Sequence, residues 1–441
     1  MNSIIRTCLR GTVGYFCLFI VIVQGGLFPA NIWAEENGLT LNQCIDYALK
    51  NQPSIRASQE AVNATLGREM QAVSLYFPQV AASAGYSESH SIGGAFGDSI
   101  SKSRASTLSV SQLLYDFGKT GNASDVARWG TRASELDAER VRQEIILNVK
   151  QAFYALLQAR KIAEVARKTI EQTASHLKQA QAFYQAGSRP RFDVTRAEVD
   201  VNNAKLGLIN ANNSIRLRTI ALNNAMGVDP GQKTDINDML PPLPALLTPD
   251  QTLSEALKNR PELQKYEADI ESARAAIRAE QANYLPTLSA SGAYAWANGT
   301  TEMGPYKGDI QNSWNAGITL TIPLFQGGLT KGRVSEARAN LYSLEAKRDA
   351  VRQSILLEVN QAFADIESAT ARVEVMESTL KKSSENLELA QGRYDAGVGP
   401  HIEVTDAQLS AVNAEMDHIQ ALYDHQLAVA RLMKSMGRGQ E

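Results

Sequence analysis

The chain is poor in cysteine, with three in 441 residues, and two of these, Cys8 and Cys17, lie near the N-terminus. If that end is removed on export, Cys44 is the one thiol left. A single thiol can form neither an internal disulfide nor a cysteine metal cluster. We therefore interpret Cys44 as a small apolar residue on a helix, and expect the exported chain to be stabilised by packing.

The chain also lacks an excess of charge of either sign. Lys and Arg number 44 and Asp and Glu 47, so the formal net charge is −3. Nucleic-acid binding requires a basic surface, so we exclude nucleic acid as the main partner. Apolar residues make up 44% of the chain and its mean hydropathy is −0.24, which excludes a bundle of membrane helices.

The N-terminus has the pattern of a targeting segment. Arg6 and Arg10 precede an uncharged run over 11–34, whose apolar part covers 13–23. An uncleaved inner-membrane anchor is the alternative, but the apolar part is short for a bilayer span. We predict a secretory signal peptide over residues 1–34.

The remaining chain contains one unit written twice. Residues 48–51 (Ala-Leu-Lys-Asn) recur at 256–259, a shift of 208, and residues 151–153 (Gln-Ala-Phe) recur at 361–363, a shift of 210. The difference of two residues falls where a hairpin loop would tolerate it. The predicted organisation after the signal peptide is a first repeat over 35–227, a proline-rich linker over 228–246, a second repeat over 247–437 and a short tail over 438–441.

Each repeat changes hydrophobic period along its length. Four segments alternate apolar with small or polar residues and predict β-strands, at about 79–90, 105–116, 287–297 and 313–324. Each strand pair is followed by a long helical hairpin, over 119–227 and 329–437, because proline is absent for most of its length and apolar residues recur every three or four positions. A glycine followed three residues later by a proline marks each reversal, at Gly187 and Gly397.

The strands have the length of tilted membrane strands, about nine to eleven residues. Aromatic residues near their ends suit the interfacial belts of a membrane barrel: Tyr86, Tyr115, Tyr294, Trp296, Trp314 and Phe325. A small soluble sheet packed on helices is the alternative, but the neighbouring helices are too long to bury the strands. Four strands cannot close a membrane barrel, which starts at about eight, so we expect oligomerisation, and a trimer would supply twelve strands.

The duplicated unit resembles the TolC-type outer-membrane efflux proteins, also called outer membrane factors. The resemblance covers residues 38–437 and is carried by the hairpin entries (77–78 and 285–286), the hairpin exits (114–118 and 324–328) and the turns (184–187 and 394–397). It implies an α+β membrane protein: a homotrimer with a twelve-stranded β-barrel among the lipids of the Gram-negative outer membrane, continued by a long α-helical barrel in the periplasm. Such a protein is a passive exit duct of a tripartite efflux or type I secretion system. Its partners are a periplasmic adaptor (membrane fusion) protein and an inner-membrane transporter.

The resemblance also assigns roles at the tips of the helical hairpins. It implies adaptor contacts at the two turns, formed by Ala186, Gly187, Ser188, Arg189, Ala396, Gly397 and Val398. Glu403 and Asp406 match acidic residues that ring the periplasmic entrance, although acids in a first helical turn are also favoured by the helix dipole. Asp193 and Tyr394 match a pair that links neighbouring hairpins. The chain departs from the family at Gly399, where some members have a locking arginine, and instead has Arg189 and Arg191 in the first turn.

We find no constellation for catalysis, a cofactor or a metal. Residues 118–120 echo a phosphate loop, but Leu113 stands where its first glycine is required, and the five histidines lack metal-ligand spacing. We expect no enzyme. The main rival to an exit duct is a periplasmic coiled-coil scaffold or adaptor that does not span the membrane, which would have no use for four strands of bilayer length.

Overall fold

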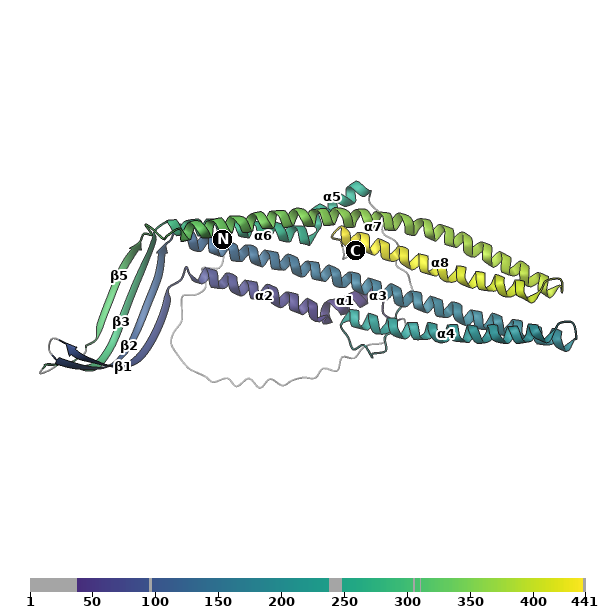
Figure 1. The fold of residues 1–441 in the computed structure, drawn as a ribbon, viewed down its shortest axis with the longest axis horizontal. Helices are drawn as coiled ribbons and strands as arrows, with labels where there is room; N and C mark the ends of the chain where they lie inside the picture. Colours follow the sequence, from purple (N-terminus) through teal and green to yellow (C-terminus); the bar gives the residue numbers. More distant parts are fainter. Residues whose placement is uncertain (1–37, 95–96, 238–247, 304–305, 310, 439–441) are drawn as a thin grey trace, which may run out of the picture.

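The computed structural model describes residues 38–94, 97–237, 248–303, 306–309 and 311–438. The predicted signal peptide over 1–34 lies outside these residues, as do part of the predicted linker (228–246) and most of the tail (438–441). The molecule is elongated, with a β-sheet at one end and two helical turns at the other (Figure 1).

Each repeat contributes two short and two long helices. The first repeat contains α1 (Leu41–Asn51), α2 (Pro53–Ser74), α3 (Lys119–Gln185) and α4 (Arg191–Met226). The second contains α5 (Pro249–Asn259), α6 (Pro261–Gln281), a 3-10 turn (Ala282–Tyr284), α7 (Leu329–Asp395) and α8 (His401–Ser435). α1 and α5 both begin with capping boxes on a threonine, and both end because the residue before a proline is extended, with ψ of 122° at Gln52 and 119° at Arg260.

The sheet is antiparallel and is built from both repeats. Its strands are β1 (Gln79–Gly94), β2 (Gly97–Tyr115), β3 (Thr287–Met303), β4 (Tyr306–Asp309) and β5 (Ser313–Thr321). The order is β1-β2-β3, and both β4 and β5 pair with β3. β1 is therefore one edge of the sheet. The other edge is formed by β5 and, nearer the loops, by β4, which both lie along the same side of β3.

The predicted strand bounds were wrong at several ends. β1, β2 and β3 continue past the predicted limits towards the loops, because the ladder persists through segments that are polar on both faces and carry no apolar period, as where Ser87 pairs with Ser103. β4 was missed. The predicted strand over 313–324 ends at Thr321, since Pro323 cannot donate to a ladder.

The sheet has two chemically distinct faces, because directly paired residues project to the same side. One side, which we call the apolar face, carries Val80, Ala82, Ala84, Tyr86, Leu108, Val110, Leu288, Ala290, Tyr294, Trp296, Trp314, Ala316, Ile318 and Leu320. The other, the hydroxyl face, carries Ser83, Ser87, Ser89, Ser101, Ser103, Thr107, Ser109, Ser111, Thr287, Ser289, Ser291, Ser313, Thr319 and Thr321, interspersed with Ala and Gly. No charged residue lies on the hydroxyl face of the described strand residues.

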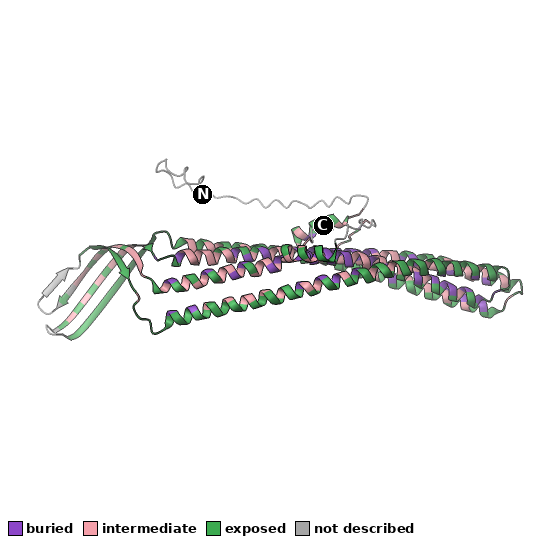
Figure 2. Ribbon diagram, turned by 90° about the horizontal axis from the view of Figure 1, so that it is seen from above, coloured by how far each residue is buried: buried purple, intermediate pink, exposed green. Residues whose placement is uncertain are grey.

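On the inner strand β2, exposure of these faces is the reverse of that in a soluble protein, whereas the edge strands β1 and β5 are exposed on both faces. Along β2 from 101 to 110, residues of the hydroxyl face are partly buried while those of the apolar face are exposed, so the sheet curves towards its hydroxyl side. Figure 2 shows the resulting alternation of intermediate and exposed positions in the strands. Large side chains remain open, with Trp314 75% and Ile318 70% exposed.

Two helices of 67 residues, α3 and α7, run the length of the helical region, about 100 Å at 1.5 Å per residue. Near the sheet, α2 packs on α3, α3 on α6, and α6 on α7. Towards the turns, α4 packs on α3, α3 on α8, and α8 on α7. α3 therefore joins the two repeats along its whole length.

The largest core cluster lies where these two halves meet, around Val149, Phe153, Leu156 and Met226. Cys44 is fully buried in it, and burial raises the pKa of its thiol to about 12. The thiol is therefore kept protonated, and Cys44 is the small core residue predicted.

Candidate functional site

The two turns at the end opposite the sheet have almost the same backbone. α3 ends in a turn at Gly187, with φ of 73°, and α7 in a turn at Gly397, with φ of 78°. The amide of each glycine donates to the carbonyl of the tyrosine three residues earlier, at 3.0 Å, and the next amide donates one residue further back. Glycine suits both positions because the left-handed backbone disfavours other residues.

A buried aromatic cluster joins the two hairpins behind these turns. Tyr394 is 1% exposed, and its ring lies 5.7 Å from that of Phe183 and 5.4 Å from that of His401. The guanidinium of Arg189 lies over the Tyr394 ring at 5.4 Å. Phe183 and Arg189 belong to the first repeat, while Tyr394 and His401 belong to the second, so the cluster is an inter-repeat contact.

Arg189 also bonds the backbone of the second turn. Its Nη2 donates to the carbonyl of Gly399 at 2.9 Å and to that of Gly397 at 3.4 Å. Gly399 was noted in the sequence as the departure from the family pattern. In the structure, the arginine of the first turn reaches the backbone beside this glycine.

Asp193 and Tyr394, predicted as a linking pair, lie in the same region but are not hydrogen bonded. Asp193 is 8% exposed, and the Tyr394 hydroxyl is buried without a hydrogen-bond partner among the described residues. Burial raises the pKa of Tyr394, and the negative charge of Asp193 adds to this effect. The two side chains are therefore neighbours without a direct hydrogen bond.

Glu403 and Asp406 lie on one exposed face of α8, while Val404 and Ala407 between and beside them are buried. Glu403 pairs with Arg393 at 3.2 Å between Oε2 and Nε. Asp406 has no ion pair within the part of the chain that the structure describes. Both carboxylates therefore face solvent in the single chain.

The residues predicted for adaptor contact are mainly exposed. Ala186, Gly187 and Ser188 are exposed in the first turn, as are Ala396, Gly397 and Val398 in the second, with Val398 at 73%. Arg189 is the exception, being partly buried by its contacts with the second turn. The two turns thus form one surface.

A polar seam around His401, not predicted from the sequence, lies behind the turns. The ring of His401 is 5% exposed, and neither of its nitrogens has a hydrogen-bond partner among the described residues. Its Nε2 lies 4.0 Å from Asp200 Oδ2 on α4. Burial lowers the pKa of His401, and also that of His176 on α3. A histidine directly after the turn proline was the available signal, but it was counted with the other scattered histidines.

The six aromatic residues predicted as belts lie at two levels of the sheet end. Tyr86, Tyr294, Trp296 and Trp314 lie within neighbouring rows of the apolar face, towards the loops. Tyr115 pairs with Leu288 at the opposite end of the strands, near the helices, and its ring lies 4.7 Å from that of Phe117. Phe325 lies beyond β5 and is 90% exposed.

Neither a membrane-spanning helix nor a cluster of metal ligands occurs among the described residues. None of the helices there is long and apolar enough to cross a membrane. Within the same residues, no group of three His, Cys, Asp or Glu side chains is arranged to hold a metal ion.

The fold and sequence match known proteins over nearly the whole chain. The family model for outer membrane efflux proteins matches residues 44–228 and 252–438. Protein CyaE of Bordetella pertussis is 27% identical over 93% of this chain and 87% of its own length, and outer membrane protein OprJ of Pseudomonas aeruginosa is 26% identical over 73% and 67%. The CmeC outer membrane channel of Campylobacter jejuni shares the fold, with a TM-score of 0.76 at 18% identity, over 93% of this chain and 91% of that one.

The two matched segments of the family model overlap the two repeats predicted over 35–227 and 247–437, and together they cover most of the chain. The protein is thus an outer-membrane channel protein of a Gram-negative bacterium, with a large helical periplasmic part. On these grounds the chain belongs to the outer membrane efflux protein family.

Proposed function

We propose that three copies of the chain form a passive exit duct, with a twelve-stranded barrel in the outer membrane and a helical barrel in the periplasm. The observation that carries this proposal is the reversed exposure of the inner strand β2, whose apolar-face residues are exposed and whose hydroxyl-face residues are partly buried. Such a sheet is suited to lipid outside and water inside. From Leu288 to Trp296 the apolar face of β3 spans nine residues, about 26 Å along the strand. At the usual tilt of about 35–45° this gives a height of roughly 19–22 Å, somewhat less than the apolar band of about 25 Å on outer-membrane barrels.

The unpaired edges support association with further copies. In the single chain, β1 and β5 each leave one side of their backbone without a neighbouring strand. Open edges are costly in lipid, where water cannot satisfy the backbone. Three copies of the four long strands, joined β1 to β5, would close a ring of twelve.

Exposed apolar side chains on the helices also favour association with further copies, in the periplasmic part. Large apolar side chains are exposed on α4 and α7: Val199, Leu206, Ile209, Leu217, Ile220, Tyr342, Leu357, Val375 and Leu389. Complete burial of an exposed apolar side chain contributes about 1.5–3 kcal/mol, and these side chains are 40–66% exposed, so each would add roughly half of that beneath a helix of another copy. The helical barrel would form through these surfaces.

At the far end, the turns at Gly187 and Gly397 would dock a periplasmic adaptor, which connects the duct to an energised inner-membrane transporter. The names of relatives support transport of two kinds. BepC of Brucella suis is named an outer membrane efflux protein, while AprF of Pseudomonas aeruginosa is named an alkaline protease secretion protein. The duct would serve efflux or type I secretion, with the transporter selecting the cargo.

Glu403 and Asp406 would form the narrowest part of the entrance. Three copies would bring six carboxylates around one axis, since each chain contributes two on an exposed face of α8. Crowded carboxylates attract cations and repel anions. Asp193 and Tyr394 would hold the neighbouring hairpins together when the entrance is closed.

Membrane fractionation followed by single-channel recording tests the proposal. We expect the chain in the outer-membrane fraction at the mass of a trimer. We also expect cation selectivity to fall by at least about threefold in the Glu403→Gln/Asp406→Gln double variant, because the ring supplies the local potential. Asp417→Asn, an exposed acid further along α8, is the matched control and should leave selectivity unchanged.

Recovery of the chain in the soluble periplasmic fraction would instead support a periplasmic scaffold and would contradict the duct. A deletion strain grown on antibiotics, dyes, bile salts and metals would separate the two transport roles. Sensitivity to several unrelated compounds indicates efflux, and loss of one secreted protein without such sensitivity indicates type I secretion.

A further inference from the structure

We propose that the apolar face of the sheet carries a binding site for a phosphorylated glycolipid of the outer leaflet, centred on Arg104. This inference rests on the proposed membrane barrel, because it requires the apolar face to meet lipid. It adds a specific ligand contact that the barrel itself does not need.

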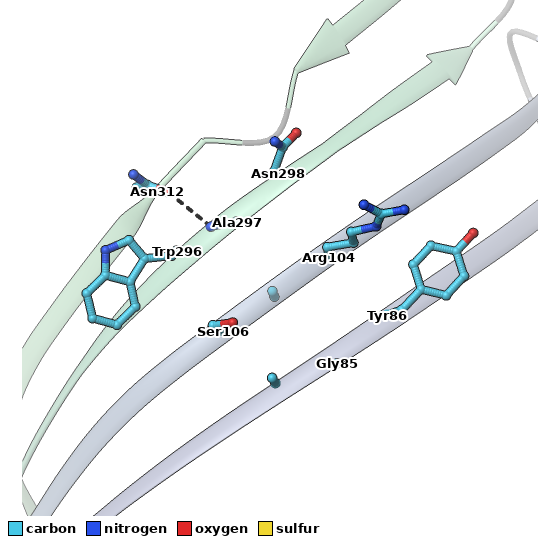
Figure 3. Close-up of a pocket in the computed structure, with 10 residues that line it drawn as sticks. Gly85, Tyr86, Arg104, Ser106, Trp296, Ala297, Asn298 and Asn312 are labelled. Atoms are coloured by element: carbon cyan, nitrogen blue, oxygen red, sulfur yellow. Dashed lines mark hydrogen bonds between the residues drawn. The ribbon is translucent and has the colours of Figure 1, made fainter.

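The site is a shallow cavity between two rows of paired residues (Figure 3). One row consists of Ala84, Ser106 and Trp296, and the next, further from the helices, of Tyr86, Arg104 and Asn298. Their side chains project from the same face, because the members of each row are direct partners across β1, β2 and β3.

The cavity exists because small residues lie between large ones on this face. Ala84 and Ser106 are short, and the strand backbone at Gly85, Ala105 and Ala297 forms the floor. Trp296, at 49% exposure, and Tyr86, at 61%, form the walls. The cavity measures roughly 740 Å³, enough for a sugar phosphate and the first carbons of its acyl chains.

Arg104 differs from the other charged residues of this face. Lys102 and Glu88 pair with each other at 3.0 Å, and Glu88 also accepts from the Tyr86 hydroxyl at 2.9 Å. Arg104 has no carboxylate partner among the described residues, and its guanidinium lies 6.0 Å from the centre of the Tyr86 ring. Glu302 is two rows further towards the loops, so the one charge directed at the cavity is positive.

Neutral donors lie at the same cavity. Asn312 accepts from the amide of Ala297 at 3.0 Å through Oδ1, which turns its amide nitrogen away from the strand. Asn298 occupies the same row as Arg104. A planar guanidinium with side-chain amides nearby is suited to bind a phosphate monoester through several hydrogen bonds.

The position of the cavity across the membrane determines which lipid can reach it. The apolar rows, including Leu108, Val110 and Leu320, lie between it and the helices, and the polar row of Glu88 and Lys102 lies on its other side. Since the helices extend into the periplasm, the cavity lies at the outer boundary of the apolar band. The lipids that present phosphate there, in the outer leaflet of a Gram-negative outer membrane, are the phosphorylated glycolipids of the lipid A class.

Native mass spectrometry of the full-length trimer tests the site. The trimer is purified from outer membranes, stripped of lipopolysaccharide and titrated with bisphosphorylated lipid A or with dephosphorylated lipid A. We expect at least about tenfold tighter binding of the bisphosphorylated form. Arg104→Gln should abolish this preference, and Arg104→Lys should keep part of it. Arg128→Gln, an exposed arginine on α3, should leave it unchanged.

A second variant protects the test against misfolding. Asn298→Asp keeps the shape of the cavity but adds a negative charge beside Arg104, and should weaken binding of bisphosphorylated lipid A alone. The site is overturned if dephosphorylated lipid A binds equally well, or if both variants keep wild-type selectivity as intact trimers. Absence of wild-type trimer from the outer membrane would overturn the proposed duct as well, so the two failures are distinguishable.

Discussion

The two turns at the helical tip share one backbone but have different surroundings. Tyr184 and Tyr394 occupy the same place in the two repeats, three residues before the turn glycine. Tyr184 is 46% exposed, whereas Tyr394 is 1% exposed and contacts Phe183 and His401. One tyrosine therefore belongs to the surface and the other to the contact between hairpins.

The difference shows how a duplicated unit becomes a matched pair. The backbone requirement, a glycine at positive φ, is kept in both copies. The side chains have diverged in a complementary way, because Arg189 donates to the carbonyl of Gly399, its own counterpart at a shift of 210. At Gly399, a Cβ atom would lie 3.1 Å from Arg393 Cβ, so even a small side chain would be crowded there.

The largest difference in tip stability is expected between truncation of Tyr394 and truncation of Tyr184. Tyr394→Ala removes a buried aromatic side chain and should cost about 3 kcal/mol of the local free energy of opening, while Tyr184→Ala should cost less than about 1 kcal/mol. Hydrogen exchange of the tip amides measures this free energy directly. If the two substitutions lower the free energy of opening equally, the buried packing of Tyr394 does not stabilise the tip.

A smaller effect is expected from the arginines of the first turn. Arg189→Ala removes the charged hydrogen bonds to the second turn and the stacking on Tyr394, and should cost about 1–2 kcal/mol in the same measurement. Arg191→Ala, at an exposed position two residues further along the chain, should change this free energy by less than about 0.5 kcal/mol. The comparison fails if Arg191→Ala is the more costly variant.

The smallest effect near neutral pH is expected from His401. The charged groups around it are Asp193, Arg196 and Asp200 on α4, with Arg189 and His176 of the first hairpin and Asp395 at the end of α7. Burial lowers the pKa of His401 below its ordinary value of 6.5, so the packed tip binds the proton less well than an opened tip.

The contribution of neutral His401 to the stability of the packed tip is therefore fully present above about pH 6.5. It falls as the pH drops below this value, by at most about 1.4 kcal/mol per pH unit for this one group. Hydrogen exchange between pH 5 and pH 7.5, corrected for intrinsic rates, measures the trend. His401→Gln should flatten it, and His425→Gln, a partly buried histidine bonded to Thr370, is the control. A trend that persists in His401→Gln would assign the pH dependence to another group, such as His176.

The repeat structure could be predicted from the sequence because its signals are local. Recurrence of short motifs, the glycine and proline at each turn, and the alternation around Trp314 and Ile318 all report on neighbouring residues. The extra residues of β1 after 90 and of β2 before 105 could not be predicted, since the Gly, Ser, Asp and Lys residues there carry no apolar period and the strands are held by their ladder.

The site was predictable only in part for the same reason. The turn residues are marked by local chemistry, and the structure places them together. The bonds from Arg189 to the second turn and the position of His401 beside Asp200 join residues about 200 positions apart, and no local pattern encodes them. The absent bond between Asp193 and Tyr394 likewise depends on side-chain geometry.

The hydroxyl face has a consequence for what such a duct can do. In the proposed barrel it would line the outer passage with hydroxyl, methyl and glycine positions and with no fixed charge along the described strands. A wall of this kind offers many weak and nearly equivalent contacts, so a hydrated solute of either sign meets neither a deep well nor a high barrier. Transit through this segment would then be governed by diffusion and width, so it would leave discrimination among cargoes to the inner-membrane transporter.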